Sequence, residues 1–240
     1  MSNEQTLANN CLKQFILRID FSGVFPCNEI AENIKDLFVR REERKVRGYR
    51  MRFNPAQGDV MPVMEQGEVL ENIFVKVDGG TLTLSPIDSS LIINTNHYVD
   101  NSAYLEILNK VVSAHWNARR IGLRYINMFD CERPATVGRI FNPPYSAIVK
   151  QLIVGETVSR AVSVQSRTSD DGNISKIQFG VANSFFPKRI SRCDLLLDID
   201  AYHVGEVTSD ESMGLVKQLN HDAFAVFREF ITERQIGAMK

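Results

Sequence analysis

The chain of 240 residues lacks most of the features that mark specialised protein classes. Its four cysteines form no CxxC pair and have no nearby histidine at metal-ligand spacing, so neither a zinc site nor a disulfide framework is expected. No segment approaches the roughly 20 apolar residues of a membrane-spanning helix, and residues 1–10 lack the apolar stretch of a secretory signal. These absences predict a cytoplasmic protein with no membrane partner.

Neither sign of charge is in excess. The 28 Lys and Arg residues against 29 Asp and Glu residues give a net charge of -1, so no global field attracts nucleic acid or an anionic membrane. A glycine-rich phosphate loop and the strand-turn-helix setting of a nucleophilic serine are also missing. The sequence therefore predicts no catalytic residue and no cofactor.

Short alternating segments followed by one long amphipathic helix occur twice along the chain. Residues 14–21 alternate, with Phe15, Leu17, Ile19 and Phe21 on one side, as in a strand with one buried face. The apolar stripes of residues 102–118 and 209–233 predict two helices, each able to cover strands that precede it. The pattern predicts an α+β protein, mainly antiparallel, covered by long helices and partly duplicated into two lobes.

Turn signals divide the remaining segments. Residues 78–80 (DGG) and 170–173 (DDGN) are typical of tight turns between antiparallel strands. Thr208 and Glu211 form a capping-box signature at the start of the last helix, and Asn28 is expected to cap an early helix. Proline and glycine predict an irregular loop at 54–67 and a connection without regular structure at 134–144. The strands expected from these limits are 72–77, 81–85, 91–94, 121–129, 158–166, 174–181 and 195–204.

The domain organisation has two interpretations. In one, residues 1–133 and 134–240 form separate α+β lobes, each with its own sheet and helix. In the other, a single continuous domain carries both helices on the same face of one sheet. The sequence fits both.

Asp198, Asp200 and His203 form the one constellation with metal-ligand chemistry. The two carboxylates lie two residues apart in an expected strand and so share a face, and hard cations such as Mg²⁺ prefer oxygen ligands. The simpler interpretation is that Leu195, Leu197, Ile199 and Ala201 make the buried face and leave both aspartates exposed to water. This second interpretation is favoured.

A basic segment near the N-terminus suggests nucleic-acid binding as an alternative. Residues 35–52 hold eight Lys and Arg residues against three acids, and Arg44, Arg47, Arg50 and Arg52 could contact phosphates. Glu42 and Glu43 interrupt the patch, and on a helix they would pair with these cations. A solvated helix end is therefore the preferred interpretation.

Arg124 and His115 stand out because of their apolar surroundings. A cation inside an apolar strand must reach solvent or pair with a carboxylate, and Asp20, Asp198 and Asp200 are the candidate partners. His115 lies on the apolar stripe of the expected helix 102–118 and is interpreted as a hydrogen-bonded core residue.

Several segments resemble a sporadically distributed family of uncharacterised bacterial proteins of about this size. They are the strand 120–127 (RIGLRYIN) after an amphipathic helix, 195–200 (LLLDID), and 219–222 (LNHD) with Phe227 and 230–232 (FIT). The resemblance implies a bacterial accessory protein, of the kind found among defence and mobile-element genes. It implies no activity.

Two classes of function follow from these observations. The favoured one is a non-catalytic interaction module that binds another protein or itself, as part of a multi-protein, defence-type system. The alternative is a metal-dependent enzyme that uses Asp198, Asp200 and His203, or a nucleic-acid-binding protein that uses the basic segment.

Overall fold

One antiparallel sheet organises the whole chain. The computed structural model describes residues 11–52, 63–76, 78–98, 102–131, 134–153, 159–183, 186–188 and 193–239. The nine strands lie in the order β2-β3-β4-β5-β1-β6-β9-β8-β7. Their bounds are β1 Leu12–Ser22, β2 Arg40–Arg52, β3 Val63–Val75, β4 Thr81–Ser85, β5 Ser90–Thr95, β6 Asn117–Cys131, β7 Arg160–Thr168, β8 Ile174–Ala182 and β9 Cys193–Thr208.

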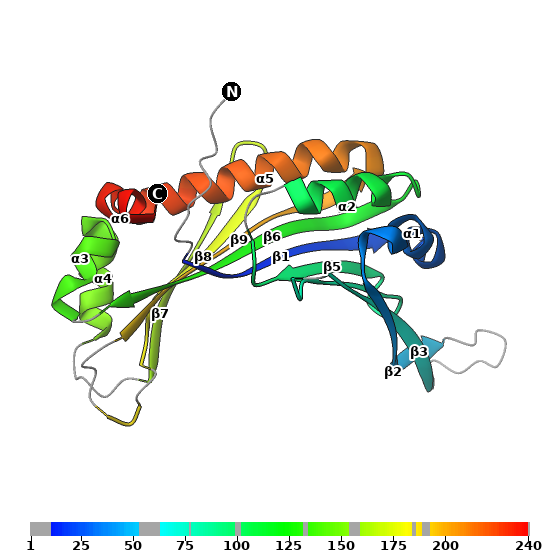
Figure 1. Cartoon of the computed structure of the whole chain (residues 1–240), viewed down its shortest axis with the longest axis horizontal. Helices are drawn as coiled ribbons and strands as arrows, with labels where there is room; N and C mark the ends of the chain where they lie inside the picture. The colour runs from blue at the N-terminus through cyan, green and yellow to red at the C-terminus, as the bar shows by residue number, and fades with distance from the viewer. Residues whose placement is uncertain are drawn as a thin grey trace.

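The helices are mostly short, so the expected cover of long helices is limited to α5. They are α1 Cys27–Ile34, α2 Ser102–Val112, α3 Val137–Ile140, α4 Pro143–Leu152, α5 Ser209–Phe230 and α6 Glu233–Met239, with short 3₁₀ turns at Lys35–Leu37 and Pro134–Thr136. The sheet bends into an arch, with α2 and α5 along its outer side and the ends at β2–β3 and β7 directed away from them (Figure 1). We call the outer side the helix side and the inner, helix-free side the concave face.

The α+β class and the antiparallel sheet are confirmed. Alternation decides which face of each strand is buried, because successive side chains point to opposite sides. Phe15, Leu17 and Ile19 of β1 lie on the helix side and are fully buried. They belong to one apolar cluster that runs the length of the sheet and includes α1, α2 and α5.

Helix α5 is the element that most closely follows the sequence. Thr208 and Glu211 form the expected capping box, and the predicted apolar stripe, from Val216 to Phe230, is buried. The helix ends at Phe230, because Ile231 is extended and bridges Phe141. The expected extension of this helix to residue 233 is therefore wrong.

The helix expected at residues 102–118 is too long by about one and a half turns, because α2 ends at Val112. His115 adopts a positive φ of 45° in the turn that follows, where it is exposed. Trp116 and Ala118 are buried; Trp116 directly precedes β6 and Ala118 belongs to it. The core-histidine interpretation of His115 is wrong, because apolar spacing alone did not separate the end of a helix from the start of a strand.

Most of the expected turns and strands are present, but a loop, a connection and a helix cap differ from the expectation. Both predicted tight turns connect antiparallel partners, β3 with β4 and β7 with β8. The expected loop at 54–67 is wrong in its last part, since residues 63–67 belong to β3, and residues 53–62 lie outside the described residues. The connection 134–144 contains α3 and the start of α4, where Pro143 and Pro144 occupy the first helical positions that proline tolerates. Helix α1 begins at Cys27 after Pro26, so Asn28 lies inside the helix and does not cap it.

The two parts of the chain meet in the middle of the sheet. Residues 1–133 contain β1 to β6 and residues 134–240 contain β7 to β9, and the two parts pair where β6 lies beside β9. The sheet is thus continuous across the expected boundary at residues 133 and 134. Among the described helices, none is long and apolar enough to cross a membrane.

Candidate functional site

The three candidate metal ligands do not converge. Asp198 and Asp200 share the concave face of β9, as their spacing predicts, but His203 lies on the helix side. There its Nδ1 is 3.1 Å from the side-chain oxygen of Asn173. The side-chain nitrogen of Asn173 in turn donates a hydrogen bond to Asp222 of α5. Within the part of the chain that the structure describes, no group of three His, Cys, Asp or Glu side chains could hold a metal ion.

Asp198 is buried, which the sequence did not predict. Arg124 of the neighbouring strand β6 donates two hydrogen bonds to its carboxylate, from Nε at 2.9 Å and from Nη2 at 2.6 Å. This hydrogen bonding raises the pKa of Arg124. The expectation that Asp198 is exposed is wrong because the inner side of a curved sheet crowds its side chains, and Arg124 lies over the carboxylate. Of the two alternatives expected for Arg124, both apply: it pairs with Asp198, one of the three candidate partners, and its side chain is 40% exposed to solvent.

A second set of charges continues from this pair across three central strands. Asp20 of β1 accepts a hydrogen bond of 2.7 Å from Nε of Arg18 and lies 3.7 Å from Arg120 of β6. Arg120 also approaches Asp200 of β9 at 3.5 Å. Burial raises the pKa of Asp200 in spite of this nearby cation.

A glycine makes room for Arg120. The guanidinium lies over the ring of Tyr202, 4.8 Å from its centroid, and crosses Gly122 on its own strand. A Cβ atom at Gly122 would lie 3.2 Å from Nη2 of Arg120 and 3.1 Å from Cβ of Tyr202. The absence of a side chain there allows the cation to lie flat on the sheet.

Three ion pairs of the concave face share an asymmetry that Arg120 and Asp200, each 26% exposed, do not show. The Asp198 side chain is 4% exposed against 40% for Arg124, and Asp20 is 10% exposed against 40% for Arg18. Glu71 and Arg44, near the end of the sheet, repeat the pattern at 9% and 63%. In each of these three pairs the carboxylate is the more buried side chain, and the guanidinium group is the one that faces solvent. We call Arg18, Arg120 and Arg124 the guanidinium cluster.

No protein-family model, curated protein or solved structure matches this chain. The guanidinium cluster therefore has to be interpreted from its own chemistry. An arginine side chain carries five N–H donors in a planar fork that suits carboxylates and phosphates. The hydrogen bonds to aspartate side chains described above use one donor of Arg18 and two of Arg124.

The basic segment has a different structure from the one expected. Residues 40–52 form strand β2 at the edge of the sheet, so the helix-end interpretation is wrong. Arg44 lies on the concave face and pairs with Glu71, whereas Arg47 is three residues away and lies on the other face, where it is exposed. Arg50 and Arg52 pair through their backbones with β3, and their side chains lie outside the described residues. Arg44 and Arg47 therefore do not share one surface.

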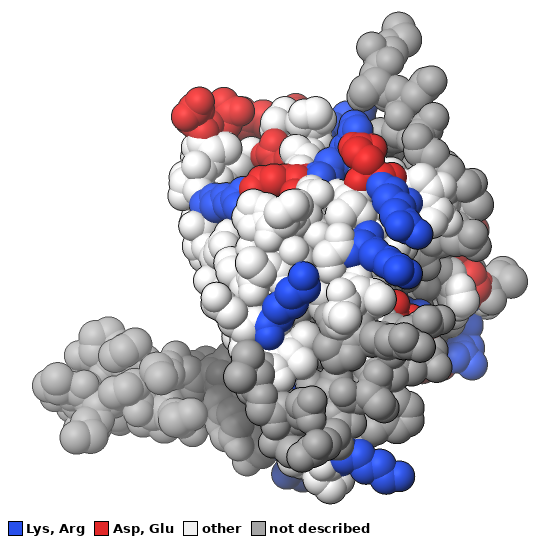
Figure 2. Space-filling model, turned by 90° about the vertical axis from the view of Figure 1, so that its left-hand side faces the viewer, with Lys and Arg blue, Asp and Glu red and all other residues white. Residues whose placement is uncertain are grey.

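Charges of both signs also mix elsewhere on the surface. Arg40 pairs with Glu42 and Lys45 pairs with Glu68, both on or beside β2. At the end of the molecule that carries α3 and α4, basic side chains are scattered and acidic ones lie mostly in the upper half of the view (Figure 2). The concave centre thus differs from these regions by its buried acids and outward cations.

Arg124 was identified from the sequence, but Arg18 and Arg120 were missed. Arg18 alternates with Ile16 and Asp20 in an amphipathic strand, which is ordinary for an exposed position. Arg18 lies on β1, and Arg120 and Arg124 lie on β6, so only the pairing of β1 with β6, which are far apart in the sequence, brings the three arginines together.

Proposed function

We propose that the protein is a non-catalytic interaction module whose concave face binds a protein partner. The partner's carboxylate and apolar side chains would contact this face. The guanidinium cluster carries this proposal, because Arg18 and Arg124 are each 40% exposed while the acids that they pair with, Asp20 and Asp198, are buried. A partner carboxylate can reach the remaining N–H donors without displacing Asp20 or Asp198. Arginine is enriched in protein interfaces and among the residues that contribute most to their affinity.

The surroundings of the cluster support a protein partner. Aliphatic side chains lie around it on the same face and are half-buried, namely Ile16, Ile92, Ile126 and Ile174, and Val164 on the edge strand β7 is 53% exposed. An apolar surface with a few arginines resembles the centre of a typical protein interface. The arch adds concave shape to this surface (Figure 1).

Nucleic acid is the weaker candidate for the same face. Tyr202 is the only aromatic residue on the concave face of the described strands, and Arg120 lies over its ring. Single-stranded nucleic acids are bound by exposed aromatic rings on which bases stack, together with a groove of one charge. With a net charge of -1 and acids paired along β2, this chain offers neither.

The setting we infer is an accessory role in a bacterial multi-protein system, as the resemblance of the sequence implies. A reducing cytoplasm suits Cys131 and Cys193, which are direct neighbours across β6 and β9 without a disulfide between them. The arrangement of β1 with β5 beside β6 with β9 supports a partial duplication, in which β6 corresponds to β1. On this interpretation the segment from β1 to α2 forms one side of the arch, and the segment from β6 to α5 forms the other.

Photocrosslinking from opposite sides of the sheet tests the proposal. A photoreactive amino acid is placed at Gln178 of β8, on the concave face, or at Gln218, on the exposed side of α5, in the full chain expressed in its native cells. We expect a defined protein adduct from position 178 and none from position 218. Adding Arg18→Gln should reduce the adduct about tenfold or more, as for an arginine central to an interface.

Lys217→Gln is the matched control, since it removes one cation from an exposed position of α5. It should leave the adduct unchanged. Equal adducts from both positions, no adduct, insensitivity to Arg18→Gln, or an adduct that nuclease removes would each overturn the proposal, and the last would favour nucleic acid.

A further inference from the structure

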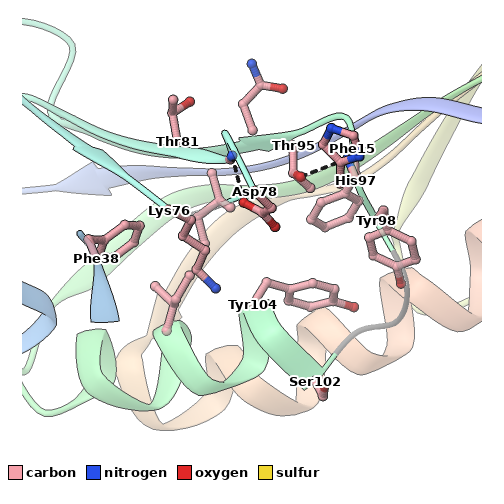
Figure 3. A pocket seen from close by; sticks show the side chains of 14 residues that line it. Phe15, Phe38, Lys76, Asp78, Thr81, Thr95, His97, Tyr98, Ser102 and Tyr104 are labelled. Atoms are coloured by element: carbon pink, nitrogen blue, oxygen red, sulfur yellow. Dashed lines mark hydrogen bonds between the residues drawn. The ribbon is translucent and has the colours of Figure 1, made fainter. Parts of the chain in front are cut away.

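A second site lies on the helix side of the sheet. A cavity of about 300 Å³ opens between the turn that joins β3 to β4, the end of β5 and helix α2 (Figure 3). Phe15, Tyr98 and Tyr104 line one end of it, and Phe38 and Lys76 line the other. The sheet separates this cavity from the guanidinium cluster, so the two sites are independent.

Three aromatic rings form a continuous apolar wall. The ring of Phe15 lies 4.8 Å from that of Tyr98 and 4.9 Å from that of Tyr104, measured between centroids. Phe15 and Tyr104 are almost completely buried and hold the half-buried Tyr98 in place, so Tyr98 is the ring that a ligand meets. A flat apolar group could pack against such rings in the offset or edge-on arrangements that aromatic pairs prefer.

Two opposite charges project into the same cavity from a short turn. Figure 3 shows Lys76 and Asp78 directed into the space between the strands and α2. The ammonium of Lys76 lies 5.9 Å from the ring centroid of Phe38, and one carboxylate oxygen of Asp78 accepts the backbone N–H of Gly80 at 2.8 Å. Among the described residues, no carboxylate pairs with Lys76 and no cation pairs with Asp78. Both charges are therefore available to a ligand.

We propose that this pocket binds a small zwitterion with an aromatic ring, the chemistry of a free aromatic amino acid. A simple anion would be attracted by Lys76 but repelled by Asp78. A simple cation would be attracted by Asp78 but repelled by Lys76. An α-carboxylate and an α-ammonium on one carbon satisfy both charges at once, and the ring packs against Tyr98, the half-buried ring of this wall. The cavity is at the small end of ligand sites, which suits a molecule of this size.

Binding measurements with four related probes test each part of the ligand. Isothermal titration of the full chain with L-phenylalanine should give saturable binding. N-acetyl-L-phenylalanine lacks the ammonium and represents the C-terminal residue of a peptide, L-phenylalanine amide lacks the carboxylate and represents an N-terminal residue, and L-alanine lacks the ring. Each should bind about tenfold more weakly or worse, the usual effect of losing a charged hydrogen bond or a buried ring.

Two substitutions locate the site. Lys76→Gln and Asp78→Asn should each weaken L-phenylalanine binding about tenfold, and the asparagine keeps an acceptor for Gly80. Lys110→Gln changes an exposed cation on α2 and should have no effect. Circular dichroism of each variant confirms that the fold is unchanged. No saturable binding at millimolar concentration, equal binding of L-alanine, or indifference to both pocket substitutions would overturn the proposal.

Discussion

At the scale of single residues, the ion pairs of the concave face stabilise the sheet only as complete pairs. A buried carboxylate costs several kcal/mol in lost hydration unless a partner compensates it. Asp198 is almost fully buried and receives two hydrogen bonds from Arg124, so the pair is balanced although it gains little over an apolar pair. Removing one member is therefore far more harmful than removing both.

We predict that Arg124→Met lowers the free energy of unfolding by about 3 kcal/mol, because it leaves the carboxylate of Asp198 buried and unpaired. The double variant Arg124→Met with Asp198→Leu should recover most of this loss. Urea unfolding of the two single variants and the double variant, treated as a double-mutant cycle, measures the coupling. Additive losses would show that the two side chains do not depend on each other.

At the scale of elements, helix α5 attaches to the sheet through a buried aromatic stripe. Phe227 packs 6.5 Å from Phe129 of β6, between ring centroids, and is 8% exposed. Phe224, one turn earlier, faces outward and is 38% exposed. The two phenylalanines provide a matched comparison within one helix.

Replacing Phe227 by Ala should cost about 3–5 kcal/mol of stability, the usual range for a buried aromatic residue. Phe224→Ala should cost less than about 1 kcal/mol, because much of its ring is already in water. Thermal or denaturant unfolding of both variants gives the comparison. Similar losses for the two would mean that α5 does not pack on the sheet through this stripe.

Elements that bury one face and expose the other were predicted from the sequence. Elements without this difference between their faces were missed. β1, α5 and the β7–β8 hairpin have clear alternation, helical periodicity or turn residues, and their predicted bounds lie within about three residues of the observed ones. β2 was missed because the residues of this edge strand up to Arg47 are almost all exposed, so burial imposes no apolar alternation on them. Pairing with β3, including Arg44 with Glu71, makes this charged segment a strand.

The candidate site was predictable only in part for a similar reason. The position of Arg124 in an apolar strand indicated a paired cation, and Asp198 was among the partners expected. The partnership of Asp20 with Arg120 depends on β1 lying beside β6, which no local pattern encodes. Asp200 likewise approaches Arg120 from β9, whose neighbour in the sheet is fixed by long-range pairing.

At the scale of the whole molecule, the order of strands couples the two halves of the chain. β6 pairs with β1 along one edge and with β9 along the other, from Asn117 opposite Thr208 to Cys131 opposite Cys193. The buried residues of both halves belong to one apolar cluster on the helix side. Cutting the chain at the expected lobe boundary, between residues 133 and 134, would leave β6 and β9 in different fragments.

We therefore predict that the protein unfolds as a single cooperative unit. Calorimetry should show one transition whose calorimetric and van't Hoff enthalpies agree. Fragments 1–133 and 134–240 made separately should lack cooperative unfolding, because each exposes one side of the β6–β9 pairing and its part of the core. The full chain cut at residue 133 and kept together is the control, since it should retain the fold. Two separate transitions, or a cooperative transition in either isolated fragment, would show instead that the chain consists of two independent lobes.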